Sequence, residues 1–85
     1  MKRVVEIRLA GRAGSAARLE ADGRRPIGII AHEHLQTVAP HLDDVLILVI
    51  TPQGEKYADP RMTVDDIEPS GEPLQIILVP MWDGT

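Results

Sequence analysis

The chain contains no cysteine, and this absence excludes several kinds of chemistry at once. Disulfides, thiolate metal sites, iron–sulfur clusters and cysteine nucleophiles all require that residue. Phenylalanine is also absent, and Tyr57 and Trp82 are the only tyrosine and tryptophan. We therefore expect an aliphatic core and a chain that supplies no redox chemistry of its own.

Long uninterrupted apolar segments are absent as well. Charged residues interrupt every apolar run between Met1 and Arg8, which is typical of neither a signal peptide nor a membrane span. The formal net charge is -4, whereas a nucleic-acid surface needs a basic face to neutralise phosphates. The sequence predicts a soluble cytoplasmic protein that binds neither a membrane nor nucleic acid.

The 85 residues allow one domain with a single core, and the first part of the chain has the alternation of a β-hairpin. In residues 3–9 the odd-numbered apolar side chains share one face, and in residues 17–21 the odd-numbered side chains do the same. Residues 11–15 contain two glycines and connect the two segments. The sequence therefore predicts two antiparallel strands.

A helix is predicted after Pro26, because proline is well suited to the first helical position. Apolar residues then recur with the helical period and form one stripe. Its members are Ile27, Ile30, Ala31, His34, Leu35 and Val38. The helix should end near Ala39 and Pro40. Gly28, in the first turn, predicts either close packing against a neighbouring segment or a frayed helix end.

Residues 45–50 are six consecutive apolar residues, rich in β-branched types. This composition predicts a third strand with apolar side chains on both faces. A turn at residues 52–54 follows, and residues 55–57 are expected to form a short edge strand.

Residues 62–67 predict a single helical turn, with Thr63 as its cap and Asp66 as an imperfect capping-box partner. The alternation of residues 74–79 then predicts the last strand. Pro80 should end that strand, because proline cannot donate to a sheet ladder.

The predicted order is strand, strand, helix, strand, short strand, helical turn and strand. This is an α+β order and corresponds to the β-grasp fold, a four- to five-stranded mixed sheet with one helix packed across it. The first and last strands should be parallel neighbours, because a long crossover separates them. We expect residues 1–79 to form this domain and residues 80–85 to form an exposed C-terminal tail.

In this arrangement the chain resembles ubiquitin and its small relatives over essentially its whole length. The likeness is most specific in three segments, which follow the family's order of turn, short strand, capped turn and closing strand. They are Pro52-Gln53-Gly54-Glu55-Lys56-Tyr57-Ala58-Asp59, Thr63-Val64-Asp65-Asp66-Ile67 and Gly71-Glu72-Pro73-Leu74-Gln75-Ile76. Leu19-Glu20-Ala21 and the helix after Pro26 match the second strand and the helix. The closer likeness is to the divergent ubiquitin-like modifiers of bacteria.

The resemblance implies a protein modifier that is attached to its target through a C-terminal glycine. Gly84 is the corresponding residue, and Thr85 would be removed first. A side chain at the terminal residue would obstruct its passage through the enzymes' narrow channels. Asp83 stands where the family often has a second glycine. The implied partners are an E1-like activating enzyme, an E2-like conjugating enzyme and a deubiquitinase-like metalloprotease that processes the C-terminus.

Two surfaces are expected to contact these partners. The first is the tail itself, at Met81, Trp82 and Asp83, because tryptophan is enriched at interfaces; alternatively, Met81 and Trp82 fold back onto the sheet. The second is an apolar patch on the exposed sheet face, the surface that ubiquitin-like domains commonly use. Its predicted members are Ile47, Val49, Ile77 and Val79.

The predicted patch assumes that Leu48 and its alternate neighbours face the helix. It depends on the turn at residues 52–54, since a shift of one residue would reverse the faces. The alternative interpretation is plain sheet surface or a surface for self-association.

The sequence favours no enzyme and no cofactor. His32, Glu33 and His34 invite a metal interpretation, but residues two apart on a helix point in different directions and no third ligand has suitable spacing. His34 is instead expected to pack at the edge of the core. No Ser/His/Asp set, paired acid or phosphate loop is visible.

Two further functions remain open for the same fold. One is a non-conjugated interaction subunit, similar to the ubiquitin-like components of type VII secretion systems or of bacterial multicomponent monooxygenases. The other is a sulfur carrier, in which the trimmed Gly84 becomes a thiocarboxylate.

Overall fold

The computed structural model describes residues 2–12, 14–42, 44–67 and 73–81. Each predicted element is present there, with ends within two residues of those expected. The elements are β1 (Lys2–Leu9), β2 (Ala17–Asp22), α1 (Ile27–Val38), β3 (Val45–Thr51), β4 (Gly54–Tyr57), a 3-10 turn (Val64–Asp66) and β5 (Leu74–Pro80). No helix in the described ranges is long and apolar enough to cross a membrane.

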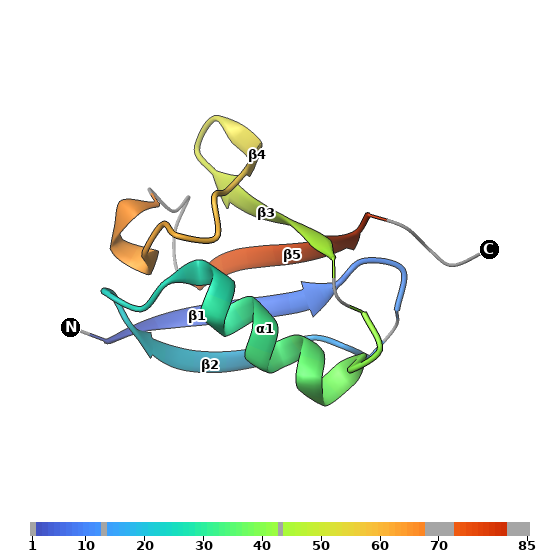
Figure 1. The fold of residues 1–85 in the computed structure, drawn as a ribbon. Coiled ribbons are helices and arrows are strands. Elements are labelled where there is room, and N and C mark those ends of the chain that lie inside the picture. The colour runs from blue at the N-terminus through green and yellow to red at the C-terminus, as the bar shows by residue number, and fades with distance from the viewer. Residues whose placement is uncertain (1, 13, 43, 68–72, 82–85) are drawn as a thin grey trace.

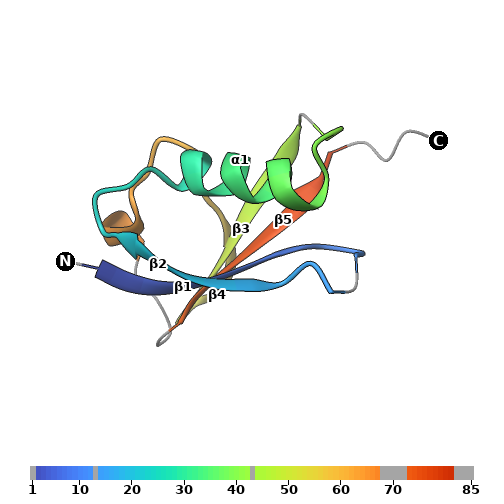
Figure 2. The same ribbon diagram turned by 90° about the horizontal axis from the view of Figure 1, so that it is seen from below.

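The strands form one mixed sheet in the order β2-β1-β5-β3-β4. β1 and β5 are parallel, as predicted, and the other neighbouring strands are antiparallel. α1 lies across one face of this sheet (Figure 1), and the view from below shows the helix and the sheet as two layers (Figure 2). The topology is that of the β-grasp fold.

The core lies between α1 and the sheet and is aliphatic in the described part of the chain. The inward residues of β1 and β5 are almost completely buried, because both strands have a neighbour on each side and the helix above them. The core residues are Val5, Ile7, Leu9, Ala21, Ile27, Ile30, Ala31, Leu35, Ala39, Ile47, Val49, Val64, Ile67, Leu74, Ile76 and Leu78. The faces predicted for both strands of the hairpin and for the helix are confirmed.

The start of α1 is held by main-chain contacts with the segment that precedes the 3-10 turn. The Ile27 N–H donates to the Met62 carbonyl at 2.7 Å, and the Gly28 N–H donates to the Pro60 carbonyl at 2.8 Å. These contacts satisfy N–H groups that have no partner within a helix. Pro26 lies one position before the helix rather than at its first residue.

The 3-10 turn has the predicted capping contact. The Asp66 carboxylate reaches back and accepts the Thr63 N–H at 3.0 Å. Val64 and Ile67 are buried beneath the turn, at 0% and 4% exposure. The turn therefore adds apolar area to the core at the end where α1 begins.

The loop between β1 and β2 contacts the opposite end of α1. The Arg12 guanidinium donates to the carbonyl of Val38, the last helical residue. A cation at this position also interacts favourably with the negative end of the helix dipole. The buried Ser15 hydroxyl accepts the Leu9 N–H at 2.9 Å, which anchors the loop to the end of β1.

Gly28 offers a test of how closely α1 approaches Pro60. A Cβ at this residue would lie 2.7 Å from the Pro60 Cβ and 2.9 Å from its carbonyl oxygen. Alanine in a helix normally stabilises by up to ~1 kcal/mol relative to glycine. We expect the opposite sign for Gly28→Ala, a loss of about 1–3 kcal/mol in the free energy of unfolding, because the clash is with backbone and a rigid ring. Urea unfolding measures it.

The matched control is Gln36→Ala, a change at an exposed position of the same helix. It should alter the free energy of unfolding by less than about 0.5 kcal/mol. A Gly28→Ala protein as stable as the wild type would contradict the close packing.

Candidate functional site

The end of β5 fixes where the chain leaves the sheet. β5 lies between β1 and β3 and extends through Pro80, one residue beyond the predicted end. The Met81 N–H then donates to the Asp44 carbonyl at 3.3 Å, so the ladder with β3 continues past the proline. The predicted end was wrong because successive N–H groups point to opposite sides of a strand. An N–H at residue 80 would point away from β3, toward the side on which β1 has already ended at Leu9. The proline therefore removes no hydrogen bond between β5 and β3.

The residues predicted to carry the chemistry lie beyond this point. Met81 is the last described residue, and its side chain is 60% exposed rather than folded onto the sheet. Trp82, Asp83, Gly84 and Thr85 lie outside the described residues. Processing at Thr85, conjugation at Gly84 and recognition of the tail therefore stay predictions.

The faces of β3 are the reverse of those predicted. Ile47 and Val49 were expected on the outer face, but they belong to the core and are 5% and 3% exposed. Their partners on β5 are the core residues Leu78 and Ile76. Opposite residues of an antiparallel pair share a face, so Ile47 and Val49 must point toward α1.

The turn after β3 explains the reversal. Thr51 has the same parity as Val49 and is 8% exposed. Its hydroxyl donates to the Gly54 carbonyl at 2.8 Å and accepts the Gln53 N–H at 3.2 Å. These two hydrogen bonds hold the Thr51 side chain on the inner face, so every second residue of β3 before it, Val49 and Ile47, also faces inward. This local pattern was the signal in the sequence that would have given the correct parity.

The outward residues of β3 form an apolar surface with their neighbours on β4 and β5. Leu48 lies opposite Ile77 on one side and Tyr57 on the other, and Leu46 lies opposite Val79. Ile77 and Val79 are on this face, as predicted. Ile77 is only 6% exposed, but it does not belong to the core cluster between the sheet and α1. We call the surface the outer patch. It consists of Leu46, Leu48, Ile50, Tyr57, Ile77 and Val79.

Exposure varies across the outer patch in a way that suits recognition. Ile77 lies at the centre of the sheet between Arg8 and Leu48 and is buried. Tyr57 and Leu46 are 70% and 36% exposed. The patch thus has a covered aliphatic centre and an accessible rim, with Arg8 along one side. Contiguous apolar surface that carries no helix is an expected site of protein contacts.

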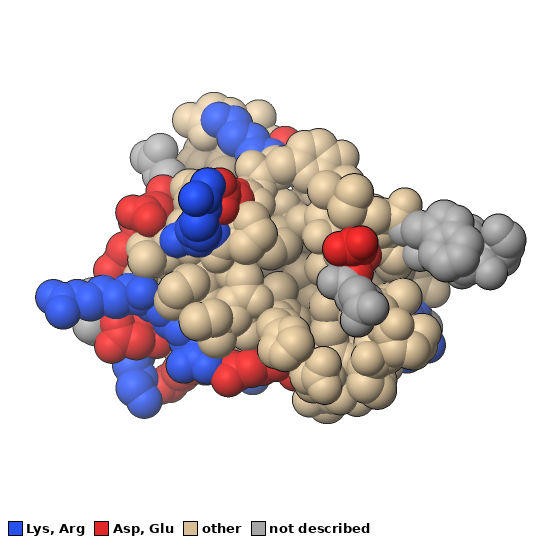
Figure 3. All heavy atoms as spheres, viewed as in Figure 1, with Lys and Arg blue, Asp and Glu red and all other residues tan. Residues whose placement is uncertain are grey.

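The opposite face differs in character. Lysine, arginine, aspartate and glutamate side chains gather there near the start of β1 and around the 3-10 turn, whereas the surface over the C-terminal half of α1 is largely uncharged (Figure 3). Both signs are interspersed, so the described part of this face presents no continuous basic surface of the kind that phosphate binding needs.

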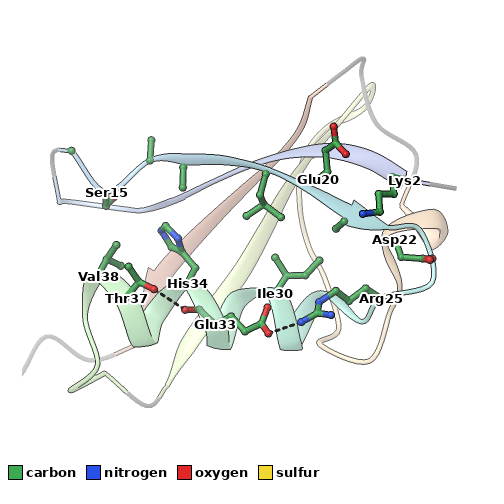
Figure 4. A pocket seen from close by; sticks show the side chains of 15 residues that line it. Lys2, Ser15, Glu20, Asp22, Arg25, Ile30, Glu33, His34, Thr37 and Val38 are labelled. Carbon is green, nitrogen blue, oxygen red and sulfur yellow. Dashed lines mark hydrogen bonds and ion pairs between the residues drawn. The ribbon is translucent and has the colours of Figure 1, made fainter.

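A groove separates α1 from β2 on this face (Figure 4). His34 projects from α1 toward β2 and is 7% exposed, which confirms the predicted packing of this residue. Its Nε2 atom has no hydrogen-bond partner among the described residues. Burial lowers the pKa of the imidazole below its usual range, and the neighbouring Ser15 main chain opposes this shift. Charged residues at the groove are Lys2, Glu20, Asp22, Arg25 and Glu33.

Among the described residues, the histidines are not grouped with other potential metal ligands. The Glu33 carboxylate forms an ion pair with the Arg25 guanidinium. The described ranges contain no group of three or more histidine, aspartate or glutamate side chains arranged to hold a metal ion.

Comparison with known proteins adds no family. No protein-family model matches the chain, and no curated protein matches it either. The sheet topology establishes the fold, and function has to be argued from the surfaces described above.

The burial of His34 predicts a specific pH dependence of stability. The unfolded histidine has a pKa near 6.5, and the folded pKa is lower. Below pH 6.5 the unfolded state therefore binds more protons, and the free energy of unfolding falls. His34→Leu removes this loss, so the stability of the variant relative to the wild type should increase between about pH 7.5 and about pH 5. Urea unfolding at both values measures the difference.

His32→Asn is the control, because His32 is exposed on the same helix. It should keep the pH dependence of the wild type. Parallel pH profiles for the wild type and His34→Leu would contradict the assignment of this dependence to His34.

Proposed function

We propose that the chain is a ubiquitin-like protein modifier whose reactive group is the carboxylate of Gly84 after removal of Thr85. The observation that carries the proposal is the path of β5. β5, a central strand of the β-grasp sheet, ends at Pro80 and is followed by the exposed Met81, and Gly84 lies three residues after Met81 in the sequence. Conjugation requires a modifier of this fold to carry a glycine shortly after its last strand, and Gly84 is in that position.

In this proposal, partner enzymes perform the catalysis and the chain supplies the acyl group. An E1-like enzyme joins the Gly84 carboxylate to the α-phosphate of ATP and releases pyrophosphate. An enzyme cysteine then displaces AMP and forms a thioester, which is passed to an E2-like enzyme. An amine of the target attacks the thioester carbonyl, an amide forms, and the thiol leaves with the amine's proton. Glycine suits each step because no side chain hinders approach to the carbonyl carbon.

The outer patch suits recognition of the modifier by these partners or by proteins that bind the conjugate. It lies on the sheet face opposite α1 and includes residues of β5, the strand that leads into the tail. A partner that binds this surface is therefore placed close to the end of β5. The exposed Tyr57 is the type of amphipathic side chain that anchors such contacts.

The test compares the wild type with two truncations, each expressed in the native host as the only copy of the gene. The proposal expects the wild type to lose Thr85, by intact mass, and to form slower-migrating adducts on immunoblots. A chain that ends at Gly84 should form the same adducts without processing. A chain that ends at Asp83 should form none, because the thioester would have to be made on a residue with a side chain.

The truncations change only residues beyond the described domain, so equal thermal unfolding of the three proteins is the folding control. Full-length wild type without adducts would refute the modifier function. A trimmed chain without adducts that carries sulfur in place of one carboxylate oxygen would indicate a sulfur carrier.

A non-conjugated interaction subunit is the second candidate, and the outer patch favours it, because that surface does not require the tail. In that case the chain would keep Thr85 and the truncations would have no effect. Leu48→Arg would instead release the partner, since it places a charge at the centre of the patch beside Ile77.

A further inference from the structure

The free edge of β2 differs from the other edge of the sheet. Within the described residues, no strand lies beyond β2. β2 has six residues, contains no proline and pairs with β1 in one constant register without a bulge. β4, at the far edge, has four residues and includes Lys56. Short length and lysine are devices that discourage pairing with another strand, and β2 has neither.

The side chains of β2 are arranged symmetrically about Leu19. Ala17 and Ala21 lie two positions away on the core side, and Arg18 and Glu20 lie one position away on the outer side. Two copies of β2 paired antiparallel with Leu19 opposite Leu19 would therefore place each Arg18 opposite Glu20 of the second copy. Opposite charges at such positions stabilise a strand pair.

The charges also favour this register over its neighbours. Facing residues share a side of the sheet, so the register can shift only in steps that keep this parity. Centring the pair on residue 18 places Arg18 opposite Arg18. Centring it on residue 20 places Glu20 opposite Glu20, although it also places each Arg18 opposite Asp22 of the second copy. Like charges directly opposite destabilise the pair. Leu19 is thus the centre that brings only opposite charges together.

Glu20 lacks a partner that the second copy would supply. Across the ladder with β1 it faces Val4, whereas Arg18 faces Glu6 and pairs with it at 3.1 Å. In the described part of the molecule Glu20 makes no ion pair. Arg18 of a second copy would lie beside Glu20 while keeping its own contact with Glu6.

The groove between α1 and β2 leaves room for the side chains of a second strand. It has a volume of about 670 Å³, larger than any single side chain, and its apolar lining includes Leu19, Ile30 and Val38. A strand added beside β2 would direct its own Leu19 to the same side of the sheet, over this lining. His34, whose Nε2 has no hydrogen-bond partner among the described residues, lies in the same groove.

We propose that two copies of this chain associate through β2, antiparallel and centred on Leu19, to form one continuous sheet across the pair. The second copy covers the groove and provides the opposite charge for Glu20. This inference is independent of the proposed modifier function, because it involves neither the tail nor the outer patch.

The test is a charge exchange for which only this register predicts that each variant alone weakens the dimer and that their mixture restores it. Arg18→Glu places a glutamate opposite Glu20 of the second copy, and Glu20→Arg places an arginine opposite Arg18 of the second copy. Each variant alone should dimerise about tenfold or more weakly than the wild type, because two attractive pairs become repulsive.

An equimolar mixture of the two variants should form a heterodimer of near wild-type affinity. In that heterodimer the introduced glutamate faces the introduced arginine, and the remaining Glu20 of one chain faces the remaining Arg18 of the other. Sedimentation equilibrium over a wide concentration range at low salt measures the wild type, the two variants and the mixture.

Circular dichroism and thermal unfolding confirm that both variants are folded, and hydrogen exchange should show β2 amides becoming protected as the wild-type concentration rises. A wild type that stays monomeric at every soluble concentration overturns the proposal and leaves the edge for an extended segment of another protein. A dimer that neither variant weakens also overturns it and places the contact elsewhere, for example at the outer patch. Weakening by both variants without rescue in the mixture overturns the register and with it the proposal.

Discussion

The parallel pairing of β1 with β5 is the interaction on which the rest of the molecule depends. It is the only ladder between the first half of the described chain, β1, β2 and α1, and the second half, β3, β4 and β5. Val5 faces Leu74 and Ile7 faces Ile76 across this ladder, and each of the four is at most 1% exposed. α1 covers the junction from one side. Loss of this pairing would leave the two halves joined by the contacts between the start of α1 and the segment around the 3-10 turn, and neither half would cover its own apolar face.

The same pairing determines which surfaces are available for function. With Ile76 turned inward by its neighbours on β1 and α1, Val49 must also turn inward, because facing residues share a side of the sheet. Leu48 then turns outward beside Ile77. The pairing of β1 with β5 therefore determines the position of the outer patch. It also determines the direction in which β5 leads toward Gly84. Both surfaces of the proposed function follow from one ladder.

Most of the fold could be predicted from the sequence wherever polar residues mark the outer face. In β1, Glu6 and Arg8 alternate with the core residues, and in α1 the apolar stripe leaves only one orientation. β3 has apolar side chains on both faces, so alternation carries no information there and the predicted patch was wrong for Ile47 and Val49. The parity follows instead from the pairing of Val49 with the buried Ile76, and from the local turn in which the Thr51 hydroxyl bonds to the main chain of Gln53 and Gly54. The groove beside β2 could not be predicted either, because it depends on the distance between α1 and the sheet.

The two proposed contacts occupy separate parts of the sheet and reinforce each other. β1 separates β2 from β5, so pairing along β2 leaves the end of β5 and the outer patch open. A twofold axis normal to a continuous sheet keeps both helices on one face and therefore places both outer patches on the other. A partner with two binding sites would then meet two copies of the patch at fixed spacing, and the second contact forms at a high effective concentration. Weak recognition by each small aliphatic surface would in this way add up to firmer binding of the pair than one patch alone provides.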